Sequence, residues 1–305
     1  MINTKEQLLL NAQIANLDIL DKFIEVCEEH NLQWFADAGT LLGAIRHKGI
    51  IPWDDDVDVV MPREDYDKLH DLADIAFSFP YFLQTEKAKP SNYQFCMQLR
   101  KLTTAKIDAE SLLLEKNRKA GDSFKINRSI GIDICPLDKV ANTESERKCL
   151  NGFVKTLYHY NTLRYYSYTE YNELLEHSDF EYAITVFNKT MRKINKVNAS
   201  SDFIAASGWF GFDICNPIVH SSCYSDYIEA NFKGLQHKIR IPIGYDEILT
   251  NYYGNYMIPV KNSNDHVQMN IDKIVCIFDY NHSQYEYADL SNEELLAMIE
   301  KGETL

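Results

Sequence analysis

The sequence holds little glycine and proline and has no long apolar run. Its 305 residues include 12 Gly and 8 Pro, which leaves little material for a long flexible linker. No stretch of about 18 consecutive apolar residues occurs, so the sequence predicts no membrane-spanning helix. The amino terminus lacks the basic start, apolar segment and small-residue cleavage site of a secretory signal, which predicts a cytoplasmic protein.

Basic residues and paired cysteines are also scarce. Lysine and arginine number 31 against 45 acidic residues, a formal net charge of −14. This charge repels the phosphate backbone of nucleic acid and disfavours purely electrostatic docking on anionic lipid. The seven cysteines are scattered without a C-x-x-C pair, as expected of reduced and mostly buried thiols. We therefore expect no nucleic-acid partner, and an anionic substrate must be met by a local site.

The residues that are present describe a globular protein in which helices and strands alternate. Hydrophobic residues make up 45% and charged residues 25%, enough to bury a core. The spacing of apolar residues predicts helices over residues 4–30, 63–76, 144–167, 177–198 and after Asp289. Strands are expected at 33–38, 56–60, 94–103, 129–136, 238–243 and 273–278. This order indicates an α/β or α+β protein.

Four aspartates, at positions 54–56 and 58, run into a valine-rich segment. In a strand, residues two apart share a face, so Asp56 and Asp58 point one way while the valines at 57 and 59 point to the core. Two carboxylates about 6 Å apart repel by roughly 3 kcal/mol at an effective dielectric near 20. A bound Mg2+, which prefers oxygen ligands and is completed by substrate phosphates, offsets that repulsion. A solvated acidic turn is the alternative.

A third carboxylate, Asp133, is the lone charge in the apolar segment 129–136. A buried carboxylate without a partner is costly. A metal shared with Asp56 and Asp58 would supply one, and hydrogen-bond donors around a structural aspartate would supply another. The sequence leaves both alternatives open, and Asp138 is expected to lie in a turn.

Gly39 and Thr40 stand where a short helix is expected to begin. The free N–H groups at a helix N-terminus bind phosphate, so these two residues are candidates for phosphate contact. Arg46, His47 and Lys48 follow and add three potential cations to a chain rich in acid. The combination within twenty residues of the aspartates predicts an anion site.

These features resemble the signature of the LicD family. The run WFADAGTLLGAIRHKGIIPWDDDVD at residues 34–58 carries most of the resemblance. Two further segments match, IGIDICPLD at 130–138 and PIGYDEILTNYYGNYM at 242–257, so that it spans roughly residues 15–260. The family resemblance implies an α+β fold of the nucleotidyltransferase-like, polymerase-beta type. Such a fold has a mixed sheet with flanking helices and, here, an additional helical region.

The resemblance also implies a reaction. Phosphocholine, or another phosphorylated alcohol, would pass from CDP-choline or another CDP-alcohol to a sugar hydroxyl of a cell-surface glycan or its precursor, with release of CMP. Mg2+ is the expected cofactor, with Mn2+ as the alternative. Asp56, Asp58 and Asp133 would be the catalytic and metal-binding residues, and Asp133 is either a ligand or the general base. Donor and phosphate contacts would come from Gly39, Thr40, Arg46, His47, Lys48, Tyr245, Asp246, Tyr253 and Gly254.

The segment that holds Tyr245, Asp246, Tyr253 and Gly254 could equally be an aromatic cluster that packs a helix. By the resemblance, residues 1–140 form the catalytic core and 141–235 a mainly helical acceptor-side region. Residues 236–305 form a C-terminal segment whose Tyr-Gly motif packs back on the core. We expect a cytoplasmic protein with transient association at the inner face of the membrane.

Two other functions use the same residues. One is a nucleotidyltransferase that transfers the NMP group to a small molecule or a protein. The other is a non-catalytic glycan-binding protein on the same fold.

Overall fold

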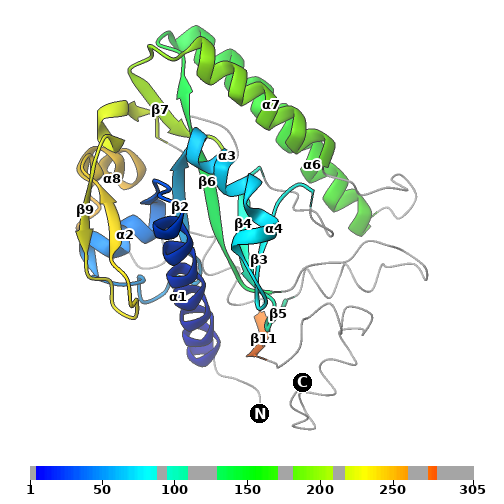
Figure 1. Cartoon of the computed structure of the whole chain (residues 1–305), viewed down its shortest axis with the longest axis vertical. Helices are drawn as coiled ribbons and strands as arrows, with labels where there is room; N and C mark the ends of the chain where they lie inside the picture. The colour runs from blue at the N-terminus through cyan, green and yellow to red at the C-terminus, as the bar shows by residue number, and fades with distance from the viewer. Residues whose placement is uncertain are drawn as a thin grey trace.

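A computed structural model describes residues 5–87, 95–108, 129–170, 181–208, 217–259 and 274–279 (Figure 1). The helices are α1 (Lys5–Glu29), α2 (Ala38–Arg46), α3 (Arg63–Asp71), α4 (Ala73–Ala76), α6 (Glu144–Glu170), α7 (Glu181–Val197) and α8 (Tyr245–Tyr253), with a short 3-10 helix, η1 (Ser221–Tyr224). The strands are β1 (Phe35–Ala36), β2 (Asp58–Pro62), β3 (Tyr81–Gln84), β4 (Met97–Lys101), β5 (Thr104–Asp108), β6 (Gly131–Val140), β7 (Phe203–Ala206), β8 (Val219–His220), β9 (Tyr227–Ala230), β10 (Ile239–Pro242) and β11 (Ile274–Asp279).

The long strand β6 is the centre of a mixed seven-stranded sheet. The strand order is β1-β2-β6-β4-β3, and β7 pairs with both β6 and β8. Strand β2 runs parallel to β6 along one edge, while β4 and then β7 run antiparallel along the other. Helices pack on this sheet, which confirms the α+β class (Figure 1).

Helix α1 shows why the sequence folds this way. Its apolar residues recur at steps of three and four, and Ile19, Leu20, Phe23 and Ile24 are each 0% exposed. The buried stripe packs against β4 and β6 of the large sheet, and the helix also contacts β11. The helix expected over residues 4–30 is therefore confirmed for Lys5–Glu29. Among the described residues, no helix is long and apolar enough to cross a membrane.

Most other expected elements are present, with two corrections. The helix expected over 63–76 is interrupted at Leu72, where α3 ends and α4 begins. The strand expected from Asp56 begins instead at Asp58. Strands β3, β5, β7, β8 and β9 were not expected from the sequence, and the helix expected after Asp289 lies outside the described residues.

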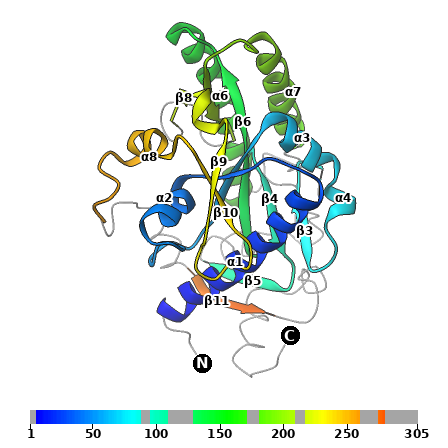
Figure 2. The same ribbon diagram turned by 60° about the vertical axis from the view of Figure 1, so that its left-hand side comes forward.

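The C-terminal motif and the helical region both join the large core. Ile241 of β10 and Ile248 and Leu249 of α8 are buried in the same apolar cluster as α1, and α8 packs against α2. Figure 2 shows the pair β9 and β10 running alongside α2. Strand β7, from the segment 141–235, extends the central sheet. The division into three units stays a prediction.

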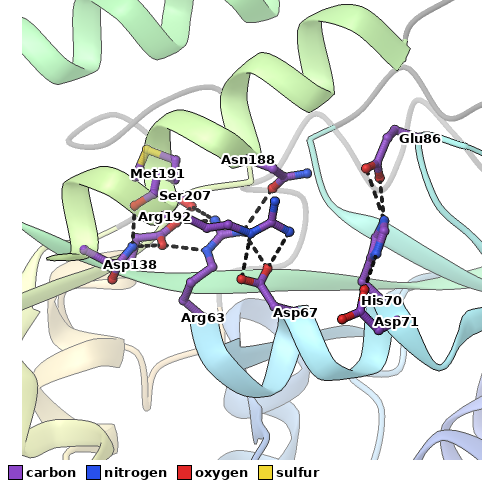
Figure 3. A network of polar contacts seen from close by, with 11 residues as sticks. Arg63, Asp67, His70, Asp71, Glu86, Asp138, Asn188, Met191, Arg192 and Ser207 are labelled. Atoms are coloured by element: carbon purple, nitrogen blue, oxygen red, sulfur yellow. Dashed lines mark hydrogen bonds and ion pairs between the residues drawn. The ribbon is translucent and has the colours of Figure 1, made fainter.

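A buried polar network joins α3, β6 and α7 (Figure 3). Arg63 donates from Nε to Asp138 Oδ1 at 2.7 Å and from Nη2 to Asp138 Oδ2 at 2.5 Å. Its Nη1 donates to Asn188 at 2.9 Å, and Asn195 and Ser207 also donate to Asp138. Asp138 is 0% exposed within β6, so the expectation of a turn residue is wrong. Its carboxylate instead neutralises the buried guanidinium of Arg63 and links α3 and α7 to the sheet.

A second buried pair, His70 with Glu86, lies beside this network, with 3.0 Å between Nε2 and Oε2 (Figure 3). The hydrogen bond that the His70 ring donates to the Glu86 carboxylate has the largest effect on the pKa of His70 and raises it, while burial lowers it. Burial would raise the pKa of Glu86, but the hydrogen bond and the charge of His70 lower it below its usual value. Both shifts favour the charged pair in the folded state.

This pair predicts a pH-dependent stability. Because the pKa of His70 is raised on folding, its contribution is complete below the unfolded-state value and is lost as pH rises through the folded value. Because the pKa of Glu86 is lowered, its contribution disappears as pH falls through the folded value. Between the folded-state pKa values of Glu86 and His70, we expect His70→Gln to lower the unfolding free energy by about 1 kcal/mol. At alkaline pH the same substitution should change the unfolding free energy little. Urea unfolding across pH measures this difference.

The control is His30→Gln, which changes a partly exposed histidine directly after α1. Its unfolding free energy should follow the wild-type pH profile. A constant difference between His70→Gln and wild type at every pH would show that the pair does not titrate as described.

Candidate active site

Asp58 and Asp133 lie side by side on two parallel strands. Asp58 opens β2, Asp133 lies near the start of β6, and the parallel register makes them direct partners. Directly paired residues on neighbouring strands project to the same face of the sheet. Burial raises the pKa of Asp58 well above its usual range, and further increases come from the charges of Asp56, Asp133, Asp54 and Asp37. The structure therefore brings the predicted carboxylates together in one electrostatic cluster.

The alternation around β2 explains this placement. Val57 and Val59 are 1% and 0% exposed in the core cluster, while Asp58 on the opposite side of the strand is partly accessible. Asp56 is exposed in the loop that leads into β2. The valines therefore face the core and the aspartates face away from it, as predicted. Of the two aspartates, Asp58 lies in the strand and Asp56 lies before it.

The start of α2 is tied to this cluster. Gly39 and Thr40 are in the first turn of the helix, and Thr40 Oγ1 accepts a hydrogen bond from the Asp58 backbone N–H at 2.9 Å. A Cβ atom at Gly39 would lie 2.6 Å from Oδ2 of Asp54. A side chain at position 39 would push that carboxylate away from the beginning of the helix. The helix N-terminus, which favours negative charge, consequently faces the acidic cluster.

Asp54 and Asp55 extend the set of possible metal ligands beyond the prediction. Asp54, Asp55 and Asp56 each offer a carboxylate oxygen, and these oxygens lie within 4.8 Å of one another. Burial raises the pKa of Asp54 well above its usual value, and the charge and hydrogen bond of Asp56 raise it further. A set of hard oxygen donors that repel one another fits Mg2+. Asp54 and Asp55 stand in the same run of aspartates, but the two-residue spacing of a strand predicted Asp56 and Asp58 as the metal ligands.

Asp37 is a functional candidate that the sequence reasoning missed. It is 2% exposed, its backbone N–H donates to the Asp58 carbonyl at 3.2 Å, and its Oδ2 accepts from the Tyr252 hydroxyl at 2.9 Å. Burial raises its pKa to about 6, although the bonds from Tyr252 and from the Ala38 N–H oppose the shift. Among the described residues, its Oδ1 has no hydrogen-bond partner. Its position just before Gly39 in the 34–58 run was the available signal.

Gln98 supports Asp133 from the other side of β6. The two residues are partners in the antiparallel β4–β6 register, and Gln98 Nε2 donates to Asp133 Oδ1 at 2.5 Å. This contact orients the carboxylate beside Asp58. Gln98 is thus a hydrogen-bond donor of the kind expected if Asp133 were a structural aspartate. The role of Asp133 as a metal ligand or general base stays a prediction.

Helix α8 contributes Tyr253 to the cluster. Burial raises the pKa of Tyr253 well above its usual value, and the charges of the aspartates at 58, 37, 54 and 56 add to the shift. Its ring stacks on Tyr252, with 5.4 Å between centroids. The Tyr252 hydroxyl in turn binds Asp37, so α8 is attached to the start of α2.

The other residues of the third motif have contacts that shape α8 itself. Tyr245 packs on the large core at the start of the helix, and Asp246 accepts from the Tyr256 hydroxyl at 2.6 Å. Gly254 caps the end of the helix with φ of 62°, and its N–H donates to the Thr250 carbonyl at 2.9 Å. The described contacts thus connect Tyr253 to the aspartates, while donor binding by Tyr245, Asp246 and Gly254 stays a prediction.

The three predicted cations lie at the far end of α2. A nine-residue helix is roughly 13 Å long, so they are separated from the phosphate-binding turn. Arg46 Nη1 donates to the Tyr256 carbonyl at 2.6 Å, the His47 ring meets Trp53 edge-on at 5.8 Å, and Lys48 is exposed. Burial lowers the pKa of Arg46, and the charge of Tyr253 opposes that shift. Arg46 is therefore in electrostatic reach of the ring that borders the cluster.

His47 has a different protonation tendency. Burial and then the charge of Arg46 both lower the pKa of its imidazole. The neutral form is favoured near neutral pH, so His47 is better suited to hydrogen bonding than to charge neutralisation.

A mixed sheet that pairs aspartates on neighbouring parallel strands, with a helix start facing them, is the arrangement expected of a nucleotidyltransferase-like domain. Residues 31–171 match the family described as "LicD/FKTN/FKRP, nucleotidyltransferase domain". A LicD family domain therefore spans this part of the chain, which confirms the resemblance. The matched range is narrower than residues 15–260, and the segment 242–257 lies outside it.

Curated relatives match over a shorter part. The lipopolysaccharide cholinephosphotransferase LicD of Haemophilus influenzae is 47% identical over 68 residues, which are 22% of this chain and 26% of that protein. An uncharacterized protein of Rickettsia prowazekii is 36% identical over 72 residues, 24% of this chain and 26% of the relative. The matches thus span about a quarter of the length of these two relatives.

Proposed function

We propose that this protein transfers a phosphorylated alcohol, first of all phosphocholine, from a CDP-alcohol to a sugar hydroxyl of a cell-surface glycan or its precursor, releasing CMP. The observation that carries the proposal is the pairing of Asp58 with Asp133 beside the start of α2. The Haemophilus relative is named a cholinephosphotransferase, which supports the choice of phosphocholine. We place the reaction in the cytoplasm.

The charge of the site supports the need for a cation. An anionic diphosphate approaching five aspartates meets repulsion, and the chain as a whole carries a net charge of −14. Bound Mg2+, or Mn2+, would supply charge neutralisation and polarise the transferred phosphate. Asp54, Asp56, Asp58 and Asp133 are the residues that would hold it.

The protein's own groups then have separate tasks. The N–H groups at the start of α2, near Gly39 and Thr40, orient a phosphate oxygen. Tyr253, whose pKa is raised by burial and by the charges of the aspartates, would limit water beside the cluster. Arg46, in the last turn of α2, would stabilise the departing CMP. Asp133, which accepts a hydrogen bond from Gln98, would accept the proton of the attacking hydroxyl when it is not a metal ligand.

A thermal-shift panel tests the proposal with CDP-choline, CDP-ribitol, CDP-glycerol, CMP and CTP, each with and without Mg2+. We expect one CDP-alcohol to raise the melting temperature by roughly 5 °C at about 100 times its dissociation constant, in a Mg2+-dependent manner. The increase should vanish in Asp58→Asn and persist in Asp74→Asn, which alters an exposed aspartate of α4. Release of CMP during transfer to a glycan acceptor completes the test.

Other outcomes point elsewhere. Stabilisation by CTP alone, with pyrophosphate release, would favour the nucleotidyltransferase alternative, in keeping with the name of the family domain. Binding of a glycan without any Mg2+-dependent nucleotide effect would favour the non-catalytic alternative.

A further inference from the structure

Helix α7 carries a concentration of positive charge that the overall composition conceals. Residues 188–201 contain four basic residues and no acidic residue, although the chain has 45 acidic residues among 305. The four are Lys189, Arg192, Lys193 and Lys196. This local balance is opposite in sign to that of the whole molecule.

The structure places most of these cations on one outward face. The opposite face of α7, with Ala183, Ile184, Phe187 and Met191, is buried in an apolar cluster against the sheet and α6. Steps of seven, four and three residues separate Tyr182, Lys189, Lys193 and Lys196, so they form one stripe on the helix, with Val197 at its edge. We call these five residues the α7 outer face.

The side chains of the α7 outer face are available to solvent. Tyr182 is 70% exposed and Val197 is 80% exposed, and the three lysines between them are exposed. Arg192, beside the stripe, is held by Asp67 at 2.8 and 2.9 Å. Within the part of the chain that the structure describes, the three lysines are in no ion pair. Helix α7 lies along an outer edge of the molecule in both views (Figure 1 and Figure 2).

We propose that the α7 outer face docks on an anionic lipid bilayer. A flat surface meets only the outermost face of a protein, and salt screens charges more than about 8 Å away, so the acidic remainder of the chain opposes this contact weakly. A flexible polyanion would wrap onto neighbouring acidic surface and lose this advantage. The exposed aromatic Tyr182 and the exposed aliphatic Val197, at the two ends of the lysine stripe, can enter the headgroup region while the lysines meet lipid phosphates.

Vesicle flotation tests this proposal with the full chain. Wild type should bind vesicles of phosphatidylcholine mixed with phosphatidylglycerol, and binding should fall with added salt. It should be weak on phosphatidylcholine alone. Removing three cations with Lys189→Gln, Lys193→Gln and Lys196→Gln together should weaken binding on the order of 100-fold. The matched control removes the same charge from α1 and the β9–β10 connection with Lys22→Gln, Lys233→Gln and Lys238→Gln, and should bind like wild type.

A further variant separates charge from apolar contact. Tyr182→Ser should weaken binding severalfold without changing its salt dependence, because it removes an inserted ring and no charge. Absence of wild-type binding to anionic vesicles, or an equal loss in the control triple variant, would overturn the proposal. So would binding to soluble polyphosphate through the same lysines that matches or exceeds binding to vesicles.

Discussion

Asp58→Asn is expected to lower the turnover number on the order of 1000-fold while leaving the fold intact. The replacement keeps the shape of the side chain but removes a charge from the centre of the carboxylate cluster. Burial and the charges of four other aspartates raise the pKa of Asp58, which therefore lies at the electrostatic centre of the proposed metal-binding residues. Transfer of phosphocholine from CDP-choline, followed as CMP release, measures the loss.

The same variant has an opposite expected effect on stability. Without divalent cation, repulsion among the aspartates opposes folding, so neutralising Asp58 should raise the unfolding free energy by about 1 to 3 kcal/mol in the presence of a chelator. Mg2+ should stabilise wild type and leave Asp58→Asn unchanged. Asp74→Asn, on the surface of α4, should match wild type in both assays. Near-normal turnover in Asp58→Asn would refute the assigned site.

The second large effect is expected at Asp138, which takes no part in the proposed chemistry. Asp138→Ala removes the bidentate partner of the buried Arg63 guanidinium and the acceptor used by Asn195 and Ser207 (Figure 3). Asp67 stays as a longer contact, with its Oδ1 3.7 Å from Nη1. Breaking a buried pair in this way costs about 3 to 5 kcal/mol. Urea unfolding at neutral pH measures the difference in unfolding free energy.

Two comparisons separate the buried charge from general damage. The double variant Arg63→Met with Asp138→Leu removes both charges and should recover much of the loss, because no unpaired ion remains. Arg192→Gln breaks a more exposed pair with Asp67, with side chains 43% and 26% exposed, and should cost less than about 1 kcal/mol. A cost of that small size for Asp138→Ala would show that Arg63 finds solvent or another partner.

Local pattern predicted many of the elements. The spacing of apolar residues identified α1, and the valine alternation placed Asp58 opposite the core. The helix follows from apolar residues that recur every three to four positions, and the placement of Asp58 follows from alternation every two positions. Both patterns can be recognised within a short segment. The run at 34–58 also predicted the family, because it is long and its order of residues is specific. The match of residues 31–171 to the LicD domain confirms this prediction.

The fold class, the family of the domain and the identity of the acidic residues could be inferred from residue order alone, because periodic spacing and contiguous motifs carry them. Which carboxylates meet depends on how the strands and helices pack. The pairing of Asp58 with Asp133 depends on the register of two strands 75 residues apart, and the bond from Tyr252 to Asp37 spans 215 positions. Asp138 became a buried counter-ion rather than a turn residue for the same reason. Such contacts arise from the packing of whole elements, which no local pattern encodes.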